Sequence, residues 1–152
     1  MSITYRKATI DDIKIVTELT LLLYSDDNTF DSLYEENQNL LKNSSQAIFL
    51  AFDDKKTIGM ADCSLRTEYV EGTSGGNIGY LEGIFVLPEY RLRGIAKSLV
   101  MLCEDWSSEQ GCKEFASDCE LTNTDSYLFH LKIGFQEANR IICFTKTLWD
   151  EY

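Results

Sequence analysis

Two arginines and a glycine stand where an apolar stretch of this chain gives way to a helical pattern. Residues 91–96 read Arg-Leu-Arg-Gly-Ile-Ala, after the apolar run 78–87 and at the start of an amphipathic run. The N-terminus of a helix presents N–H groups without intrahelical partners and about half a positive charge. A glycine lets an anion approach those amides, and arginines add charged donors. The turn therefore fits phosphate groups, and a solvated basic helix cap is the alternative interpretation.

Two carboxylates in apolar surroundings are the second chemical feature. Glu82 stands inside Tyr-Leu-Glu-Gly-Ile, and Asp118 stands inside Ala-Ser-Asp-Cys. A carboxylate in such surroundings is paired, protonated or facing a cleft. In a cleft, the two acids would bind an ammonium group. A structural salt bridge is the alternative for each of them.

These residues need elements to position them, and the hydrophobic pattern predicts one α/β domain over residues 1–152. We expect strands at 2–8, 47–52, 57–69, 78–87, 113–119 and 140–148, and helices at 10–24, 33–43, 94–110 and 123–134. The predicted order is a strand, two helices, three antiparallel strands, and then helix, strand, helix and strand. No linker, repeat or second domain interrupts this order.

Local signals mark several ends of these elements. Thr9 is expected to cap the first helix, with Asp12 as the acid of a capping box, and Ser32 to cap the second helix. Gly83, inside the apolar run, predicts a β-bulge. Gly134 is expected at the C-terminal end of the last helix.

The charge of the chain bears on its partners. Its 152 residues include 14 Lys+Arg and 25 Asp+Glu, which gives a formal net charge of −11. This balance argues against nucleic acid, because binding a phosphate backbone takes a basic face. A negative field attracts a polycation, and improved solubility is the alternative. Five acids between residues 26 and 36 form either an acidic rim at the mouth of the proposed cleft or a solvated loop and helix cap: Asp26, Asp27, Asp31, Glu35 and Glu36.

The cysteines and the apolar runs bear on the compartment. There are five cysteines, no C-x-x-C pair and one histidine, a composition typical of reduced thiols without a metal site. No apolar run reaches the roughly 20 residues that span a bilayer, and the first residues lack the apolar core of a signal peptide. We therefore expect a cytoplasmic protein without membrane contact.

Two of these stretches resemble motifs of the GNAT acetyltransferase superfamily. Residues 91–96 are similar to its R/Q-x-x-G-x-G/A motif, and residues 123–135 are similar to its later motif around a helix that faces acyl-CoA. Residues 61–72, 80–96, 114–123 and 134–137 further resemble one subgroup, the aminoglycoside 6'-N-acetyltransferases. The resemblance implies the GNAT fold, a mixed and splayed sheet flanked by helices and split near its middle.

The resemblance also implies roles for particular residues. Acetyl-CoA would lie against Ile84, Phe85, Val86, Arg91, Leu92, Arg93, Gly94, Ile95, Ala96 and Asn123. The amine substrate would meet Glu82 and Asp118, flanked by Tyr24 and Tyr69, with Asn139 nearby. Tyr24 stands where the subgroup tends to carry tryptophan, and Asn139 stands where an acid is usual. Acyl transfer needs a neutral amine, so we expect the carboxylates of Glu82 and Asp118 also to be catalytic, removing a proton directly or through water.

His130 occupies a position where many members of the superfamily carry a tyrosine that protonates the departing CoA thiolate. The pKa of a histidine normally lies near neutrality, so His130 is a candidate for this step. Packing beside the pantetheine is its alternative role. Tyr127, one helical turn earlier, is a second candidate.

The function implied is transfer of an acetyl group from acetyl-CoA to the 6'-amine of an aminoglycoside, which confers resistance, by direct attack in a ternary complex. A polyamine or protein N-acetyltransferase and a non-catalytic acyl-CoA-binding module are the alternatives. A covalent route through Cys119 is disfavoured because no base is identified beside it. The apolar stretch 140–148 resembles a strand that family members exchange or pair across a homodimer, so we expect a homodimer.

Overall fold

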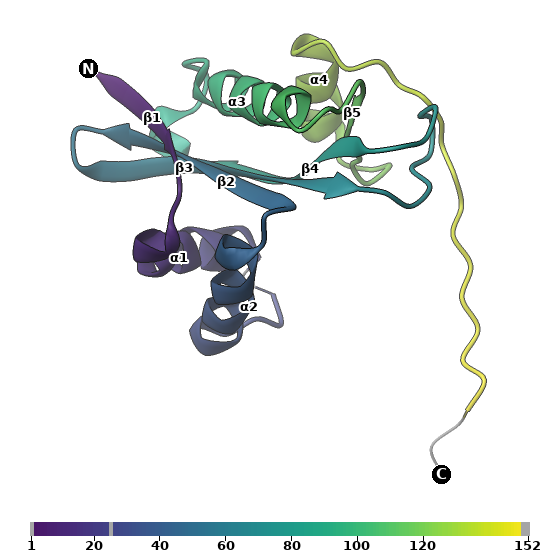
Figure 1. Cartoon of the computed structure of the whole chain (residues 1–152), viewed down its shortest axis with the longest axis horizontal. Helices are drawn as coiled ribbons and strands as arrows, with labels where there is room; N and C mark the ends of the chain where they lie inside the picture. Colours follow the sequence, from purple (N-terminus) through teal and green to yellow (C-terminus); the bar gives the residue numbers. More distant parts are fainter. Residues whose placement is uncertain (1, 25, 150–152) are drawn as a thin grey trace. The chain divides into compact units, whose positions relative to one another are not determined.

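The computed structural model describes residues 2–24 and 26–149 and divides the chain into two compact units, Met1–Asp118 and Cys119–Tyr152. The first unit contains a five-stranded sheet in the order β1-β2-β3-β4-β5 (Figure 1). Its strands are β1 (Ile3–Lys7), β2 (Gln46–Asp53), β3 (Lys56–Arg66), β4 (Ile78–Val86) and β5 (Phe115–Ala116). Neighbouring strands from β1 to β4 are antiparallel, and β5 is parallel to β4.

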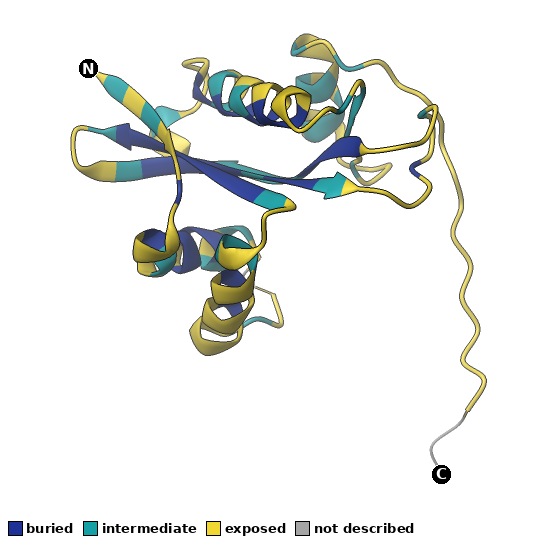
Figure 2. Cartoon of the chain, viewed as in Figure 1, coloured by how far each residue is buried: buried dark blue, intermediate teal, exposed yellow. Residues whose placement is uncertain are grey.

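Helices cover both faces of this sheet (Figure 1). On one face lie α1 (Ile13–Leu23) and α2 (Phe30–Lys42), whose apolar side chains pack with Ile48, Leu50 and Met60. On the other face lies α3 (Ile95–Glu109), where Ser107 approaches Gly79 and Leu99 approaches Gly59. The even-numbered residues of β3 therefore face α1 and α2, as the two-residue period of a strand requires. Burial is concentrated in β2 and β3, the strands between these two layers (Figure 2).

The helix ends agree with the predicted signals at one position and differ at another. Thr9 precedes the short 3-10 helix η1 (Ile10–Asp12) that leads into α1, and its N–H donates to the Asp12 carboxylate at 2.8 Å, so the capping box is confirmed. The prediction that Ser32 caps the second helix was wrong. Thr29 is the cap, and its hydroxyl accepts from the Ser32 N–H at 3.2 Å. Both residues are good caps, and the helix extends three residues further back than its apolar pattern indicates.

The bulge predicted at Gly83 is present. Asp62 on β3 is paired with Gly83, whereas the next residue, Cys63, is paired with Leu81. Glu82 is therefore the extra residue of the bulge, and the strand changes register at that point. Beyond the bulge, β4 has no described strand on its second edge, because β5 pairs only with Gly79 and Tyr80. The sheet is open along the C-terminal half of β4, as a splayed sheet requires.

The second unit contains α4 (Thr124–Lys132) followed by an extended segment. Gly134 follows the helix at φ 104°, and the Phe135 N–H donates to the His130 carbonyl at 3.0 Å, so the glycine end of this helix is confirmed. The strand predicted at 140–148 is absent from the structure. These residues have no regular secondary structure, and their apolar side chains are exposed (Figure 2). A strand needs a neighbour for its backbone hydrogen bonds, and no described strand pairs with this segment.

Candidate functional site

The bulge places Glu82 in a dense set of hydrogen bonds from β3. Its Oε1 accepts from the Ser64 hydroxyl at 2.6 Å and from Nε and Nη2 of Arg66 at 3.0 and 2.9 Å. Its Oε2 accepts from Arg66 Nη2 at 2.9 Å. Ser64 and Arg66 are successive residues on one face of β3, so the strand presents both donors to the same carboxylate. The salt bridge considered as an alternative for Glu82 is present, and among the described contacts Oε2 keeps the greater capacity to accept a further donor.

Tyr80 connects this set to Asp118. The Tyr80 hydroxyl donates to Asp118 Oδ2, and the guanidinium of Arg66 lies 3.5 Å from the centre of the Tyr80 ring. Burial raises the pKa of Tyr80 above its ordinary value, and the hydrogen bond to Asp118 raises it further, so the phenol remains a donor. Arg66 and Tyr80 thus link the two acids that the sequence analysis selected, although neither had been predicted to do so.

Tyr24 lies at the same bulge. It forms the C-terminal cap of α1, and its hydroxyl donates to the backbone carbonyl of Glu82 at 3.4 Å. A Cβ on Gly83 would come within 2.5 Å of the Tyr24 hydroxyl, so only glycine leaves room for this ring. Burial raises the pKa of Tyr24, and the negative charges of Asp62 and Glu82 raise it further. Tyr24 therefore contacts the backbone of Glu82 at the bulge.

Asp62 belongs to this region and was missed by the sequence analysis. It is partly buried on β3, and its Oδ1 is enclosed without a hydrogen-bond partner among the described residues. Burial raises its pKa from the ordinary 3.8 to about 7, and the charge of Glu82 contributes to this rise. Its place inside a strand rich in small and apolar residues resembles that of Glu82, and this context was the signal available in the sequence.

The basic turn at residues 91–96 has the geometry of an anion site. Leu92 and Gly94 both adopt left-handed backbone conformations, at φ 64° and 79°, and Gly94 caps α3. A Cβ on Gly94 would meet no atom within 4 Å, so the space beside the first turn of α3 is open. The Nε of Arg91 donates to the Val86 carbonyl at 2.9 Å and ties the turn to the end of β4. Open space, unpaired helix amides and arginines together fit a polyphosphate.

The backbone of β4 between the bulge and this turn carries the other residues expected at the acyl donor. Ile84, Phe85 and Val86 pair with Ala61, Met60 and Gly59 of β3. Their opposite edge has no described strand beside it, so backbone groups on that side are available to an extended ligand. The bulge, this open edge and the basic turn follow one another along the chain.

The remaining predicted residues lie in two further places. Tyr69 is exposed in the loop after β3, and its hydroxyl donates to Glu71 at 2.7 Å, which raises its pKa. In the second unit, Asn123 caps α4 by accepting from the Ser126 N–H at 3.1 Å. Asn139 is exposed, and its side-chain oxygen accepts from the Arg140 N–H at 2.8 Å.

His130, also in the second unit, is held by its own helix. Its Nδ1 lies 2.6 Å from the Ser126 carbonyl oxygen, and its ring packs near Phe129 and Phe135. A carbonyl oxygen only accepts, so Nδ1 carries a hydrogen. The neutral ring therefore has its lone pair on Nε2, and donation from Nε2 requires the imidazolium. Tyr127 lies earlier on α4, with the Arg140 guanidinium 5.8 Å from its ring centre.

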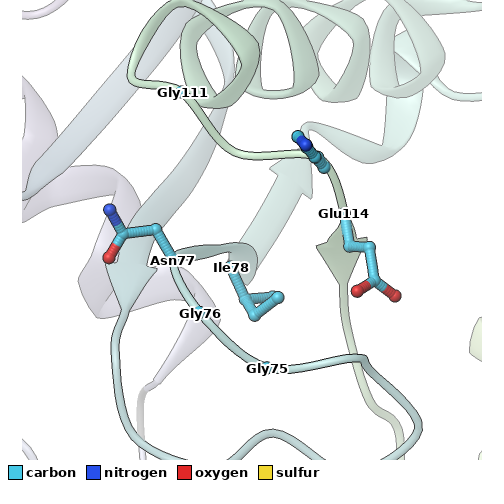
Figure 3. Close-up of a pocket in the computed structure, with 7 residues that line it drawn as sticks. Gly75, Gly76, Asn77, Ile78, Gly111 and Glu114 are labelled. Atoms are coloured by element: carbon cyan, nitrogen blue, oxygen red, sulfur yellow. The ribbon is translucent and has the colours of Figure 1, made fainter.

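A small open pocket lies elsewhere in the first unit. At the start of β4, Gly75, Gly76 and Asn77 lie on one side of it and Glu114 lies on the other (Figure 3), and Lys113 also belongs to its lining. The residues selected above are absent from its lining. Across the described residues there is no group of three or more His, Cys, Asp or Glu side chains placed to hold a metal ion, and no helix long and apolar enough to span a membrane.

Comparisons with known proteins agree with this arrangement. The sequence profile of the acetyltransferase (GNAT) family matches residues 13–135. An aminoglycoside N(6')-acetyltransferase type 1 of Acinetobacter haemolyticus is 39% identical over 131 residues, which cover 86% of this chain and 89% of that protein. The structure of AAC(6')-Iy in complex with the bisubstrate analog CoA-S-monomethyl-acetylneamine superposes with a TM-score of 0.92 at 33% identity, covering 97% of this chain and 99% of that one.

A second solved structure, AAC(6')-Ih from Acinetobacter baumannii, has a TM-score of 0.90 at 36% identity and covers 97% of this chain and 100% of that one. The fold expected from the sequence motifs is therefore confirmed. The profile match spans most of the chain and includes the bulge, the basic turn and α4. By sequence and by fold, the chain belongs to the acetyltransferase (GNAT) family.

Proposed function

We propose that this chain transfers the acetyl group of acetyl-CoA to the 6'-amine of aminoglycosides and thereby confers resistance to them. The observation that carries the proposal is the linked pair of acids, Glu82 and Asp118, at a strand bulge that leads into an open, basic helix N-terminus. The first feature suits a cationic amine, and the second suits the phosphates of CoA. The relatives with this activity, at 33–39% identity over most of the chain, support the same substrate.

In this proposal the amine attacks the thioester directly. Oε2 of Glu82 and the exposed Asp118 carboxylate hold the ammonium group, with Tyr24 and Tyr69 beside the sugar rings and Asn139 as a neutral contact. The backbone of Ile84–Val86 and the side chain of Asn123 hold the pantetheine arm, and residues 91–96 hold the pyrophosphate. His130, as imidazolium, protonates the departing thiolate. We further propose that both compact units form one GNAT domain, because the profile match crosses the boundary between them.

A pair of substrates that differ at one position tests the proposal. Neomycin carries an amine at its 6' position, where paromomycin carries a hydroxyl group. We expect thiol release from acetyl-CoA with neomycin and none above background with paromomycin. Spermidine and a lysine-rich peptide cover the alternative enzymes. Turnover of those alone would replace the proposed substrate, and binding of acetyl-CoA without turnover of any amine would indicate a non-catalytic module.

We also propose that the chain is a cytoplasmic homodimer that needs neither nucleic acid nor membrane. Its five cysteines are free thiols, which supports a reducing compartment. Ile142, Phe144 and Trp149 of the last segment are more than 80% exposed, which supports pairing of that segment with a second copy.

Charge placed on this apolar segment tests the homodimer. Phe144→Lys is expected to shift the mass measured by light scattering from dimer to monomer, whereas Leu121→Lys, at an exposed apolar residue outside this segment, is not. An unchanged dimer in the Phe144 variant would exclude this segment as the interface.

A further inference from the structure

Among the acids near the bulge in the described part of the chain, Asp62 has an enclosed oxygen without a hydrogen-bond partner. It lies on β3 between Ile48 of β2 and Gly83 of β4, on the sheet face that α1 and α2 cover. Oδ1 has no hydrogen-bond partner among the described residues. A buried carboxylate oxygen without a donor is costly when ionised, and protonation removes that cost. Asp62 is therefore prepared to take up a proton.

The other two acids at the site are already engaged. Glu82 Oε1 accepts three hydrogen bonds from Ser64 and Arg66, and Asp118 accepts from Tyr80. Each contact uses a lone pair that a proton would otherwise occupy. The lone pairs that remain on these two acids can hold a cation, and Asp62 is a separate acceptor for the proton that this cation releases.

Tyr24 lies between the substrate side and Asp62. An ideal Cβ on Gly83 would be 2.5 Å from the Tyr24 hydroxyl, and Gly83 is directly opposite Asp62. Opposed Cβ positions in an antiparallel pair lie about 5 Å apart, so the Asp62 side chain starts close to the place that the Tyr24 hydroxyl occupies. The negative charge of Asp62 also acts on the pKa of Tyr24. The two side chains are neighbours across this pair, and because no hydrogen bond joins them among the described contacts, the Asp62 carboxyl group must turn toward the hydroxyl for a proton to pass.

We propose that Asp62 accepts, through the Tyr24 hydroxyl, the proton that the substrate ammonium loses before acetyl transfer. This inference rests on the proposed function. The ammonium N–H bond breaks as an O–H bond forms at Tyr24, and the original Tyr24 proton passes to Asp62. A cation and a carboxylate become a neutral amine and a carboxylic acid. The nitrogen loses a second proton as the amide forms, the departing sulfur gains one, and Asp62 releases its proton to solvent after the product leaves.

Several groups face Asp62 and influence when it ionises. Glu82 on β4 adds a negative charge, and the Tyr24 phenol lies at the end of α1. On the opposite face of the sheet, the contact with Cys63 and burial raise the pKa of the Cys103 thiol of α3, and the charge of Asp62 makes a smaller contribution. Burial makes the largest contribution and holds the pKa of Asp62 at about 7. A proton acceptor with this pKa is well matched to neutral pH.

The test compares pH profiles of kcat/KM for neomycin in four variants. Asp62→Asn and Tyr24→Phe each remove one part of the relay, and the double variant removes both. Asp11→Asn removes an exposed acid on η1 as a matched control. We expect each single variant to lose about 10²-fold or more, with an unchanged KM for acetyl-CoA. We expect the double variant to lose no more than the singles, because both residues serve one step.

The profile itself separates a proton acceptor from a packing residue. The wild type is expected to lose activity below pH 7, and Asp62→Asn is expected to lack that acid limb. NMR titration of carboxyl-labelled aspartate gives a readout independent of turnover, with one midpoint near pH 7 that Asp62→Asn removes. An Asp62→Asn enzyme that keeps both its rate and its acid limb, beside an active wild type, overturns the relay alone. A wild type that acetylates no aminoglycoside overturns the proposed function instead.

Discussion

The ionisation of Asp62 couples the folding stability of the protein to pH. The unfolded chain ionises this residue near its ordinary pKa of 3.8, and the folded protein does so near 7. Below about pH 4 the acid is neutral in both states, and above about pH 7 the folded state carries a buried charge. The raised pKa of Asp62 therefore makes the free energy of unfolding fall as the pH rises from 4 to 7.

Asp62→Asn should remove that dependence. Relative to wild type, the free energy of unfolding of the variant should rise by about 1–4 kcal/mol between pH 4 and pH 8, because one pKa unit corresponds to about 1.4 kcal/mol. Urea denaturation of both proteins at the two pH values measures this gain. Asp11→Asn, an exposed change of the same kind, should show none. Equal pH dependence in Asp62→Asn and wild type would mean that Asp62 is hydrated in the folded protein.

At the scale of residues, the sequence singled out two acids but not the side chains that donate hydrogen bonds to them. Glu82 and Asp118 were recognisable because each stands in an apolar stretch. Ser64, Arg66 and Tyr80 were not selected, because their roles depend on the register between β3 and β4. That register shifts at the bulge and cannot be derived from either strand alone.

At the scale of elements, the turn before α3 is the feature most open to a decisive test. Gly94→Asp places a side chain and a negative charge in the open space where phosphates are proposed to lie. Acetyl-CoA binding should be lost while the fold is retained, because no neighbouring atom lies within 4 Å of the new Cβ. Isothermal titration calorimetry measures the binding, and circular dichroism checks the fold.

Gly111→Asp provides a matched control for the turn. Gly111 also has a positive φ, of 91°, and also has no atom within 4 Å of its Cβ position. It carries the same backbone strain and the same added charge beyond the other end of α3. This control should bind acetyl-CoA normally. Equal losses of binding in both variants would assign the effect to strain or to overall charge.

The prediction of two helix ends succeeded because these ends depend on a few neighbouring residues. The prediction of the last strand failed because a strand also depends on a second strand to pair with. The capping box at Thr9 and the glycine end of α4 depend on a few neighbouring residues, and both are present. Residues 140–148 have an apolar pattern typical of a strand, yet a strand also requires a paired edge. The apolar pattern of this segment therefore led to a wrong prediction of its secondary structure.

At the scale of the whole molecule, the net charge of −11 should appear in the kinetics. A polyamine is attracted by the summed field as well as by contacts at the site, and salt screens this field over about 8–10 Å. The kcat/KM for neomycin should therefore fall more steeply from 50 to 500 mM NaCl than that for a substrate with a single amine. Parallel salt curves for the two substrates would confine the electrostatic effect to local contacts.

The distribution of burial along the chain has a consequence for biosynthesis. Every described residue that is buried lies at or before Ser107, and the compact unit that contains them ends at Asp118. Domains fold from the N-terminal side as the ribosome adds about 5–20 residues per second. The part of the chain that forms the apolar core is therefore synthesised, and leaves the ribosome, before α4 and the segment after it. A chain shortened to end at Asp118 would therefore keep every residue that is buried in the described structure, while it would lack α4 and Asn123.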